Sequence, residues 1–500
     1  MSNSVLHFSV QTLSPIHIGS GRELQGNYEY LYFPSHKKIA LIDESKVLGI
    51  LGEAHINQWL SIIDKGESLL ALLKDRSREL APVDIAQRII EVGEKALGTE
   101  GNIREQFHDG MGYPLLPGSS LKGGIRTAFV TQKILGEYGA PKKMSREKLG
   151  FFKKNNPQKF QWKDNGLEND FLAKGVSKGT EPNHDLFRLL RPGDIRFSHT
   201  EVFRLITLNK HHDGWKDDTK ISTLIEVIPP QQEGYLRLLN PKETLINYLK
   251  REKCKFSFPL SPTEMEWKHL SYLVNKHSQR RLEEELAFWE AEASSSLTIS
   301  YKEALMELHQ KSQHLKEGAC MLQIGFGSGI NGITGGWQKT AMDPRDYQGW
   351  VSSFRKSAPQ LAFPKTRKVS PTGYPLGYIV LKPLDCKNVS AFKSEWEQRR
   401  KKKLTEHSQG MVPQKILPQY PLKSKKIKRG MLLDAFVFKK QEQPKRKRIH
   451  VYVKKGKEIQ VDIPYPSDAI LGKIIEVEVI EIKDGKVSQV KFKRIKTQNR

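Results

Sequence analysis

Short segments of β character lie scattered along the chain, and helical segments do not alternate with them in a regular order. The strand-like stretches are Val5–Leu13, Tyr28–Phe33, Lys38–Ile42, Asp194–Leu208 and Ile221–Leu239. The segment from Pro262 to about Gln313 is instead rich in helix formers, and we expect two helices there. This order argues against a doubly wound sheet and predicts an α+β fold with helical insertions.

With 500 residues, the chain is too long for one compact core, so we expect two or three units. Residues 1–245 and 246–390 would form two modules, the second with a helical segment and a glycine-rich loop. The charge run Lys393–Lys403 and the prolines of Pro413–Pro421 predict a basic linker over residues 391–424. Residues 425–500 alternate as strands and predict a small basic β-barrel of OB-like type.

The charge balance points to a polyanionic partner. Lys and Arg number 82 against 56 Asp and Glu, which gives a formal net charge of +26 and makes nucleic acid the first partner to consider. No apolar run approaches the ~20 residues that span a bilayer, and the first residues lack a signal-peptide core. Three cysteines without a CxxC spacing support neither disulfides nor a zinc finger. We therefore expect a cytoplasmic protein without membrane contact, cofactor or metal.

The segment Pro114–Phe129 combines a Pro-Gly turn with the start of a helix. A serine cap, unpaired backbone N–H groups and two basic residues on one helix face could together hold phosphates. The pair Gly123-Gly124 costs about 1 kcal/mol per residue in a helix, unless something approaches the backbone closely. An ordinary capped helix with solvated basic residues is the alternative. The candidate contacts are Ser119, Ser120, Lys122 and Arg126.

The second candidate site is the glycine-rich stretch Gly325–Trp337, which follows strand-like residues. It contains a formal GxGxxG, but Gly335-Gly336 would break the helix that a dinucleotide-binding fold requires next. Such a loop can instead let an RNA backbone lie against peptide N–H groups while an aromatic ring stacks on a base. A flexible surface loop is the alternative. The candidate contacts are Gly325, Phe326, Gly327 and Gly329.

Histidines and isolated basic residues carry weaker signals. The triplet His211-His212-Asp213 lacks a third metal ligand at a recognisable spacing, so an ordinary polar loop is favoured. His17 lies between two isoleucines, which favours a packed or hydrogen-bonded ring over a catalytic one. Lys365 and Arg367 are candidate phosphate contacts because of the net charge. The sequence shows neither a Ser-His-Asp triad context nor a paired-carboxylate motif.

The order of the motifs resembles the RAMP superfamily of CRISPR proteins over roughly residues 5–385. The resemblance is carried by Ser14-Pro15-Ile16-His17-Ile18-Gly19-Ser20-Gly21, Tyr28-Glu29-Tyr30, Ile42-Asp43, Leu116–Ala128 and Gly325–Gly336. Phe363–Arg367 followed by Pro375–Tyr378 resembles the closing signature of the fifth Csm subunit of type III-A effector complexes. The resemblance implies two ferredoxin-like, RRM-type modules and a role in capping the 3′ side of the crRNA.

The resemblance also implies partners and further site residues. The partners would be crRNA and target RNA, the neighbouring RAMP backbone subunit and the small subunit. His17 and Ser20 join the expected RNA contacts. Target-cleaving relatives carry an aspartate in the loop after the corresponding turn, whereas Arg22–Asn27 has none. We therefore expect an RNA-binding subunit without nuclease activity, and the rival hypothesis is a RAMP endoribonuclease that processes crRNA or cleaves target RNA.

Overall fold

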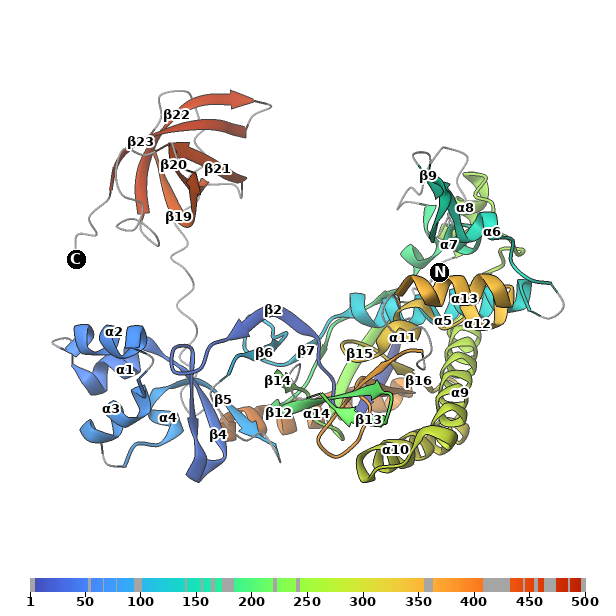
Figure 1. The fold of residues 1–500 in the computed structure, drawn as a ribbon, viewed down its shortest axis with the longest axis horizontal. Helices are drawn as coiled ribbons and strands as arrows, with labels where there is room; N and C mark the ends of the chain where they lie inside the picture. The colour runs from blue at the N-terminus through green and yellow to red at the C-terminus, as the bar shows by residue number, and fades with distance from the viewer. Residues whose placement is uncertain are drawn as a thin grey trace. The chain divides into compact units, whose positions relative to one another are not determined.

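The computed structural model divides the chain into two compact units, Met1–Gln414 and Lys415–Arg500 (Figure 1). The structure describes residues 5–52, 55–65, 67–77, 79–93, 101–139, 142–153, 156–162, 167–172, 184–218, 223–239, 243–354, 363–407, 432–443, 446–453, 457–462, 474–483 and 486–495. Within these residues, every helix is too short or too polar to cross a membrane.

A five-stranded sheet in the first unit joins segments that are distant in sequence. Its order is β10-β15-β1-β18-β16. The strands are β1 (Val5–Thr12), β10 (Arg191–Pro192), β15 (Glu233–Leu239), β16 (Cys320–Gln323) and β18 (Tyr378–Pro383). Strand β1 pairs antiparallel with both β15 and β18, so the N-terminal strand lies at the centre of this sheet.

A nine-stranded sheet has the order β2-β6-β14-β12-β5-β4-β3, with β13 and β17 also paired to β12. Its strands are β2 (Gly19–Leu24), β3 (Tyr30–Phe33), β4 (Lys38–Ile42), β5 (Ala86–Val92), β6 (Ile103–Gln106), β12 (Glu201–His211), β13 (Gly214–Asp217), β14 (Thr223–Val227) and β17 (Thr366–Val369). The predicted hairpin around Pro34–His36 is present as β3 and β4. Two short pairs join β7 (Leu115–Leu116) to β11 (Ile195–Arg196), and β8 (Gly150–Lys153) to β9 (Asn156–Trp162).

Helices α5 (Gly118–Glu137) and α9 (Trp267–Glu292) pack against the five-stranded sheet. Leu121, Ile125 and Phe129 of α5 are spaced one helical turn apart and are fully buried, because they form the face turned towards the core. Helix α9 continues into α10 (Ser296–Gln313), so the two helices expected after Pro262 are both present.

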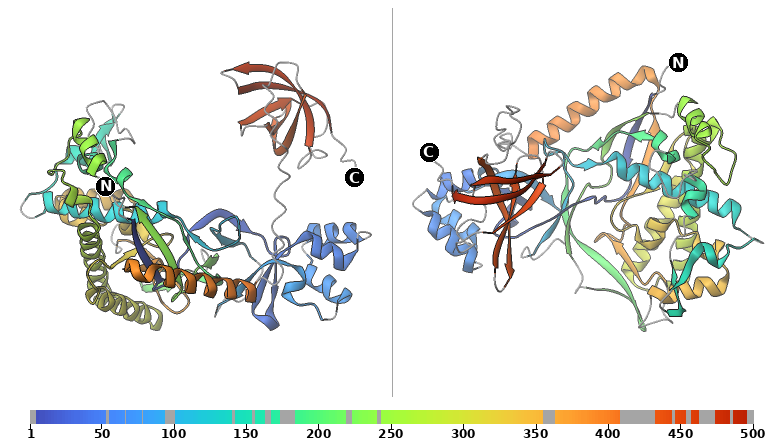
Figure 2. Two further views of the ribbon diagram at one scale, coloured as in Figure 1. Left: turned by 180° about the vertical axis from the view of Figure 1, so that it is seen from behind. Right: turned by 90° about the horizontal axis from the view of Figure 1, so that it is seen from above.

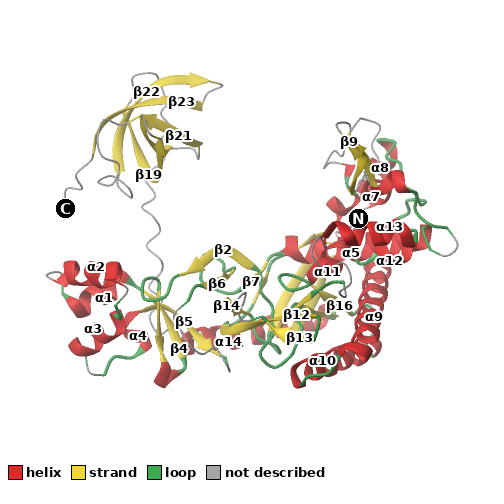
Figure 3. Ribbon diagram, viewed as in Figure 1, coloured by secondary structure: helices red, strands yellow, loops and turns green. Residues whose placement is uncertain are grey.

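The remaining helices are seen in Figures 2 and 3, with α1 to α4 gathered beside β4 and β5. They are α1 (Glu44–Leu51), α2 (Ile56–Lys65), α3 (Leu69–Arg76), α4 (Pro82–Ile85), α6 (Arg146–Leu149), α7 (Leu167–Leu172), α8 (Glu243–Arg251), α11 (Gly329–Thr334), α12 (Gln338–Ala341), α13 (Pro344–Phe354), α14 (Cys386–His407), and the 3₁₀ turns η1 (Pro34–His36), η4 (Leu186–Leu189) and η6 (Pro262–Met265).

Two predicted features of the domain organisation differ from the structure: the module boundary at residue 245 and the linker over residues 391–424. Residue 245 does not separate two modules, because the five-stranded sheet takes β1 and β15 from before it and β16 and β18 from after it. The basic run expected in the linker forms α14, since Lys, Arg, Glu and Gln favour helices. The indole N–H of Trp396 joins α14 to β15, because it donates to the carbonyl of Glu233 over 2.9 Å. The stretch Pro413–Pro421 lies outside the described residues.

The described residues of the second unit form an antiparallel sheet in the order β21-β20-β19-β22-β23. Its strands are β19 (Leu432–Gln443), β20 (Arg446–Val453), β21 (Lys457–Asp462), β22 (Ile474–Lys483) and β23 (Lys486–Ile495). The terminal strands β21 and β23 are in contact, so the sheet curls towards a barrel. The α+β class is confirmed, whereas the ferredoxin-like modules and the OB-like topology stay predictions.

Candidate nucleic-acid interface

Two predicted motifs meet in space beside the end of β1: the His17 turn (Ile16–Gly21) and the glycine loop (Gly325–Gly336). The amide of Phe326 donates to the carbonyl of His17 over 2.9 Å. Gly377, which precedes β18, donates to the carbonyl of the proline before the turn over 2.8 Å. Backbone hydrogen bonds therefore fix both motifs against the centre of the five-stranded sheet.

The glycines of this loop serve two different purposes. Gly325 has a φ of +75°, and a Cβ there would lie 2.7 Å from the carbonyl oxygen of His17. Gly327, at φ +92°, would place its Cβ 3.1 Å from the Cβ of Leu376. Gly329, at φ +68°, is exposed and has open space where a Cβ would lie. The fold itself requires the first two glycines, whereas Gly329 leaves its backbone accessible to a ligand.

Phe326 is half-buried, and its ring already has neighbours. The His17 ring meets it edge-on with centroids 5.6 Å apart, and the Arg104 guanidinium lies 5.5 Å from its centroid. Burial and the charge of Arg104 lower the pKa of Lys368, whose ammonium donates to the hydroxyl of Thr207 over 2.7 Å. Arg104, which no sequence motif indicated, and Lys368 therefore place two basic side chains near Phe326, and Glu23 pairs with the first of them.

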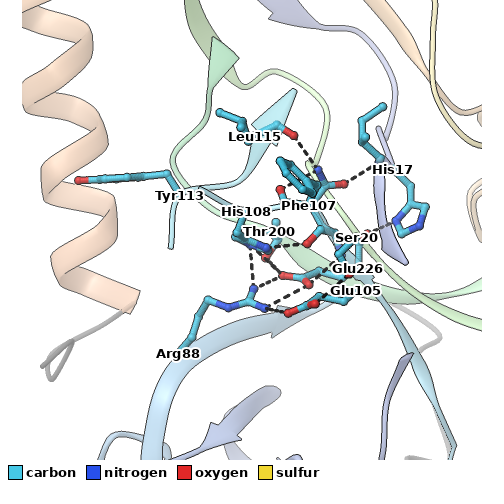
Figure 4. A network of polar contacts seen from close by, with 12 residues as sticks. His17, Ser20, Arg88, Glu105, Phe107, His108, Tyr113, Leu115, Thr200 and Glu226 are labelled. Carbon is cyan, nitrogen blue, oxygen red and sulfur yellow. Dashed lines mark hydrogen bonds and ion pairs between the residues drawn. The ribbon is translucent and has the colours of Figure 1, made fainter. Parts of the chain in front are cut away.

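A buried polar network lies directly under the His17 turn (Figure 4). Its centre is the carboxylate of Glu226, which is fully buried and forms an ion pair with Arg88. The hydroxyl of Thr200 donates to this carboxylate over 2.5 Å, and the backbone amide of Gln106 donates over 3.1 Å. The ring of His17 is linked to the same residue, because its Nδ1 lies 2.7 Å from the backbone carbonyl of Glu226.

Two further residues extend the network to the surface. Glu105 accepts from Arg88 over 3.4 Å and from the hydroxyl of Ser20 over 2.9 Å. His108 lies between Arg88, which is 2.9 Å from its Nε2, and the carbonyl of Gln106, which is 2.7 Å from its Nδ1. This arrangement favours a neutral ring, with Nδ1 donating to the carbonyl and Nε2 accepting from the guanidinium, while Oε1 of Glu226 lies farther from Nε2, at 3.4 Å.

The protonation states follow from this packing. Burial alone would raise the pKa of Glu226, but the charge of Arg88 and the hydrogen bonds from Arg88 and Thr200 hold the pKa below its ordinary value. Burial, helped by Arg88, lowers the pKa of His108 to about 4. Burial also lowers the pKa of His17. At neutral pH, the network therefore contains a paired carboxylate and neutral histidines.

This network is a support and does not resemble an exposed acid–base pair. The Arg88, Glu105 and His108 side chains are 14%, 14% and 11% accessible, and each already has partners. Glu23, in the loop that lacks an aspartate, pairs with Arg104 at 3.4 Å. Nowhere in the described ranges do three or more His, Cys, Asp or Glu side chains gather as a metal site would require. One sequence signal could have revealed the network: an acidic residue inside the apolar strand β14.

The structure corrects the expected serine cap of α5. Pro117 occupies the N-cap position, so Ser119 and Ser120 lie inside the first turn. The amide of Gly118 is already bound, because it donates to the carboxylate of Asp194 over 2.7 Å. Gly124 is explained by the fold as well: a Cβ there would lie 3.0 Å from side chains on the strand that leads into the glycine loop. The segment therefore lies next to the loop, with Ser119 exposed.

The two basic residues of α5 differ in availability. The Arg126 guanidinium binds Glu168 at 2.6 Å and approaches Asp185 at 3.5 Å, so most of its charge is compensated. Lys122 is half-buried, and its pKa is lowered by burial and by the nearby charges of Arg191 and Arg126, against the opposing effect of Asp185. Lys122 is thus the better candidate for a phosphate.

Arg367 differs from the expectation of an RNA contact. Its side chain is only 10% accessible and forms an ion pair with Glu285. Its guanidinium also lies 5.1 Å from the centroid of Phe288, so it serves to hold α9 against β17. We therefore remove Arg367 from the candidate contacts. Lys365 is exposed and remains a candidate.

Comparisons with known proteins agree with this fold. A family model described as the RAMP superfamily matches residues 9–329. The Csm5 protein of a CRISPR system from Streptococcus thermophilus is 28% identical over 200 residues, which cover 38% of this chain and 50% of that protein. The chain thus matches about half the length of this curated relative.

A solved structure supports the same assignment at the level of the fold. A chain in the cryo-EM structure of a Csm–crRNA–target RNA ternary complex, from a type III-A CRISPR–Cas system, superimposes with a TM-score of 0.54 and 19% identity, covering 75% of this chain and 100% of that chain. The family match spans more than half of the sequence, from β1 to the start of α11. The chain therefore belongs to the RAMP superfamily.

Proposed function

We propose that the chain is a crRNA-binding subunit of a type III-A Csm effector complex, where it caps the 3′ side of the crRNA without nuclease activity of its own. Its likeness to Csm5 and to a chain of a Csm–crRNA–target RNA complex supports this role. The net charge of +26 fits a polyanionic ligand.

The observation that carries the proposal is the convergence of the His17 turn, the glycine loop and the start of α5. Gly329 presents accessible backbone, and Ser119 and Lys122 lie on the neighbouring helix. Single-stranded RNA is held by such combinations of backbone N–H groups, small side chains and basic residues, because phosphates need donors and close approach. We infer that Phe326 supports this surface more than it stacks on bases, since its ring is half-buried.

The chemistry around the turn favours binding over cleavage. A nuclease needs an accessible acid–base group or metal ligand near the scissile phosphate. The acidic residues closest to the turn are engaged, Glu23 by Arg104 and Glu105 by Arg88 and Ser20. In our proposal, these carboxylates hold the turn in place and do not act on RNA.

The proposed partners are crRNA, target RNA, the neighbouring RAMP backbone subunit and the small subunit. We also propose that the second unit adds affinity that does not depend on sequence, because its described strands carry many lysines and arginines. Such contacts weaken as salt rises.

A paired glycine experiment tests the binding role. Gly329 and Gly214 both have a positive φ and open space around the missing Cβ, but only Gly329 lies in the proposed interface. Gly329→Val should weaken binding of single-stranded RNA in fluorescence anisotropy, whereas Gly214→Val, which also forces a side chain into a positive-φ conformation, should leave it unchanged. Equal effects of the two substitutions would reject the interface.

A cleavage assay tests the absence of nuclease activity. We expect purified protein to leave labelled crRNA and target RNA intact with Mg²⁺ or Mn²⁺. Metal-dependent cleavage that is lost on changing one acidic or histidine residue, such as Glu23→Gln, would instead establish the endoribonuclease.

A further inference from the structure

Helix α9 carries side-chain nitrogen atoms that have no hydrogen-bond acceptor among the described residues. Neighbouring Arg280 is engaged, since its Nη2 donates to the carbonyl of Gly335 over 2.6 Å and its Nη1 lies 2.5 Å from Glu284. His277 and Arg281 differ: the buried Nδ1 of His277 and the buried Nη1 of Arg281 have no hydrogen-bond partner among the described residues. Buried polar atoms without partners are rare in folded proteins, so the pair needs an explanation.

Both side chains line one small cavity to which α5, α9, β16, α11 and β18 all contribute. Thr127 from α5, His277 and Arg281 from α9 and Gly332 from α11 contribute to its wall, and its volume is about 20 Å³. A cavity of this size holds one water-sized group, which needs about 10–15 Å³. The cavity therefore accommodates a single oxygen atom of a ligand, but not a whole phosphate group.

The electrostatics of this cavity favour an anion over water. Its wall contains no carboxylate. The charge of Arg281 helps to lower the pKa of Glu285, but that carboxylate already accepts hydrogen bonds from Arg367 and Trp289. Burial and the charges of Arg281 and Arg280 hold the pKa of His277 well below its ordinary value, so the ring is neutral at neutral pH. A guanidinium whose Nη1 lacks an acceptor and whose neighbouring carboxylate is bound to another arginine gains most from a negative oxygen, because a buried charge without a full set of partners is expensive.

We propose that this cavity receives one non-bridging oxygen of an RNA backbone phosphate. Arg281 donates through Nη1, the neutral ring of His277 through Nδ1–H, and Thr127 through its hydroxyl. The remaining phosphate atoms lie outside the cavity, between α5 and the glycine loop. This inference rests on the proposed function, because it assigns the phosphate to the bound RNA, and it adds a contact that no motif in the sequence indicated.

RNA binding by the full chain provides the first test. Fluorescence anisotropy with a labelled oligouridine of about 20 nucleotides is measured over a range of salt concentrations. Arg281→Gln should flatten the log–log salt dependence by about one phosphate contact, ~0.7 for a single strand. Thr127→Val keeps the charge and should lower affinity by about 5-fold with an unchanged slope. Lys276→Gln removes the same charge from the exposed face of α9 and should leave the slope unchanged.

Inorganic phosphate provides a second test that does not depend on RNA. In full-length protein with ring-labelled histidine, the His277 signal is assigned by comparison with His277→Gln. Phosphate should raise the pKa of His277 more than chloride at equal ionic strength, because the oxyanion stabilises the imidazolium, and Arg281→Gln should abolish this difference.

The outcomes separate this inference from the proposed function. The cavity is not an RNA contact if the wild type binds RNA but Arg281→Gln and Thr127→Val change neither the affinity nor its salt dependence. The same conclusion follows if Lys276→Gln flattens the salt dependence as much as Arg281→Gln does. A His277 signal that responds equally to phosphate and chloride would show a cavity filled by water only. If the wild type fails to bind RNA, the proposed function and the RNA contact fail together, while the phosphate titration still decides whether the cavity binds an oxyanion. Thermal melting of each variant verifies folding, and Thr127→Val keeps the test decisive if Arg281→Gln does not fold.

Discussion

His108 should make the first unit sensitive to acid, and replacing it should remove part of this sensitivity. Its Nδ1 faces the carbonyl of Gln106, and its Nε2 faces the guanidinium of Arg88. A proton on Nε2 would set two donors against each other, so the folded state accepts it only near a pKa of about 4. His108→Gln keeps an oxygen that can accept from Arg88 but does not titrate.

The size of the stability change follows from the difference in proton binding between the unfolded and folded states. The unfolded histidine has a pKa of about 6.5, so between about pH 6.5 and pH 4 the unfolded chain binds a proton that the folded chain excludes. Stability therefore falls as pH decreases through this window and is restored above it. Between about pH 7.5 and pH 5, the loss from this one group is about 2 kcal/mol. Glu226 stays ionised over this range because its pKa is lowered, so its ion pair with Arg88 persists.

Urea unfolding at the two pH values measures the effect. All 8 tryptophans precede residue 414, so tryptophan fluorescence follows the first unit alone. Between about pH 7.5 and pH 5, the free energy of unfolding should fall by about 2 kcal/mol more in the wild type than in His108→Gln. The contribution of His277 is the same in both proteins and cancels in this comparison. Equal losses in the two proteins would refute the assignment of a neutral, buried His108.

Three further predictions concern the glycines, helix α5 and the second unit. A Cβ at Gly377, at φ +93°, would overlap a neighbouring carbonyl oxygen. Gly377→Ala should therefore lower the free energy of unfolding in urea by more than about 2 kcal/mol, whereas Gly329→Ala should lower it by about 1 kcal/mol. Equal losses in the two variants would contradict the close approach at Gly377. Lys122→Ala should reduce the slope of RNA binding against salt by up to ~0.7, and Arg126→Ala by less because Arg126 is already paired; the reverse order would show that the ion pairs open on binding. A chain ending at Gln414 should keep its tryptophan fluorescence but bind RNA more weakly, most of all at low salt, and unchanged affinity across the salt range would remove the second unit from RNA binding.

Features set by local pattern could be predicted from the sequence. The hairpin around Pro34–His36, the N-terminal strand and the helices after Pro262 depend on residues close in sequence, and they are present. The serine cap failed for a reason that local pattern cannot reveal: Asp194, 76 residues away, takes the amide at the start of α5. Propensity alone could not distinguish that arrangement from a capped helix.

The electrostatic part of the site was harder to predict because charge partners come from distant segments. From the sequence alone, Arg367 is one of several basic residues expected to be exposed. In the fold, the carboxylate of Glu285, 82 positions earlier, forms an ion pair with its guanidinium. For the same reason, the sequence did not indicate the role of Arg88, because its partner Glu226 lies 138 positions away. The one visible sign was the acidic residue within an apolar strand, since such a residue is buried only with a partner.

Cross-linking within the assembled effector complex tests whether this chain binds the 3′ side of the crRNA through the proposed interface. Complexes that contain this chain are loaded with crRNA carrying a photoreactive uridine near its 3′ end or near its 5′ end, irradiated and digested for mass spectrometry. If the chain caps the 3′ side of the crRNA, cross-links form from the 3′ position only, to peptides that contain the His17 turn, the start of α5 and the glycine loop. Cross-links from the 5′ position alone, or none to these three segments, would contradict this role.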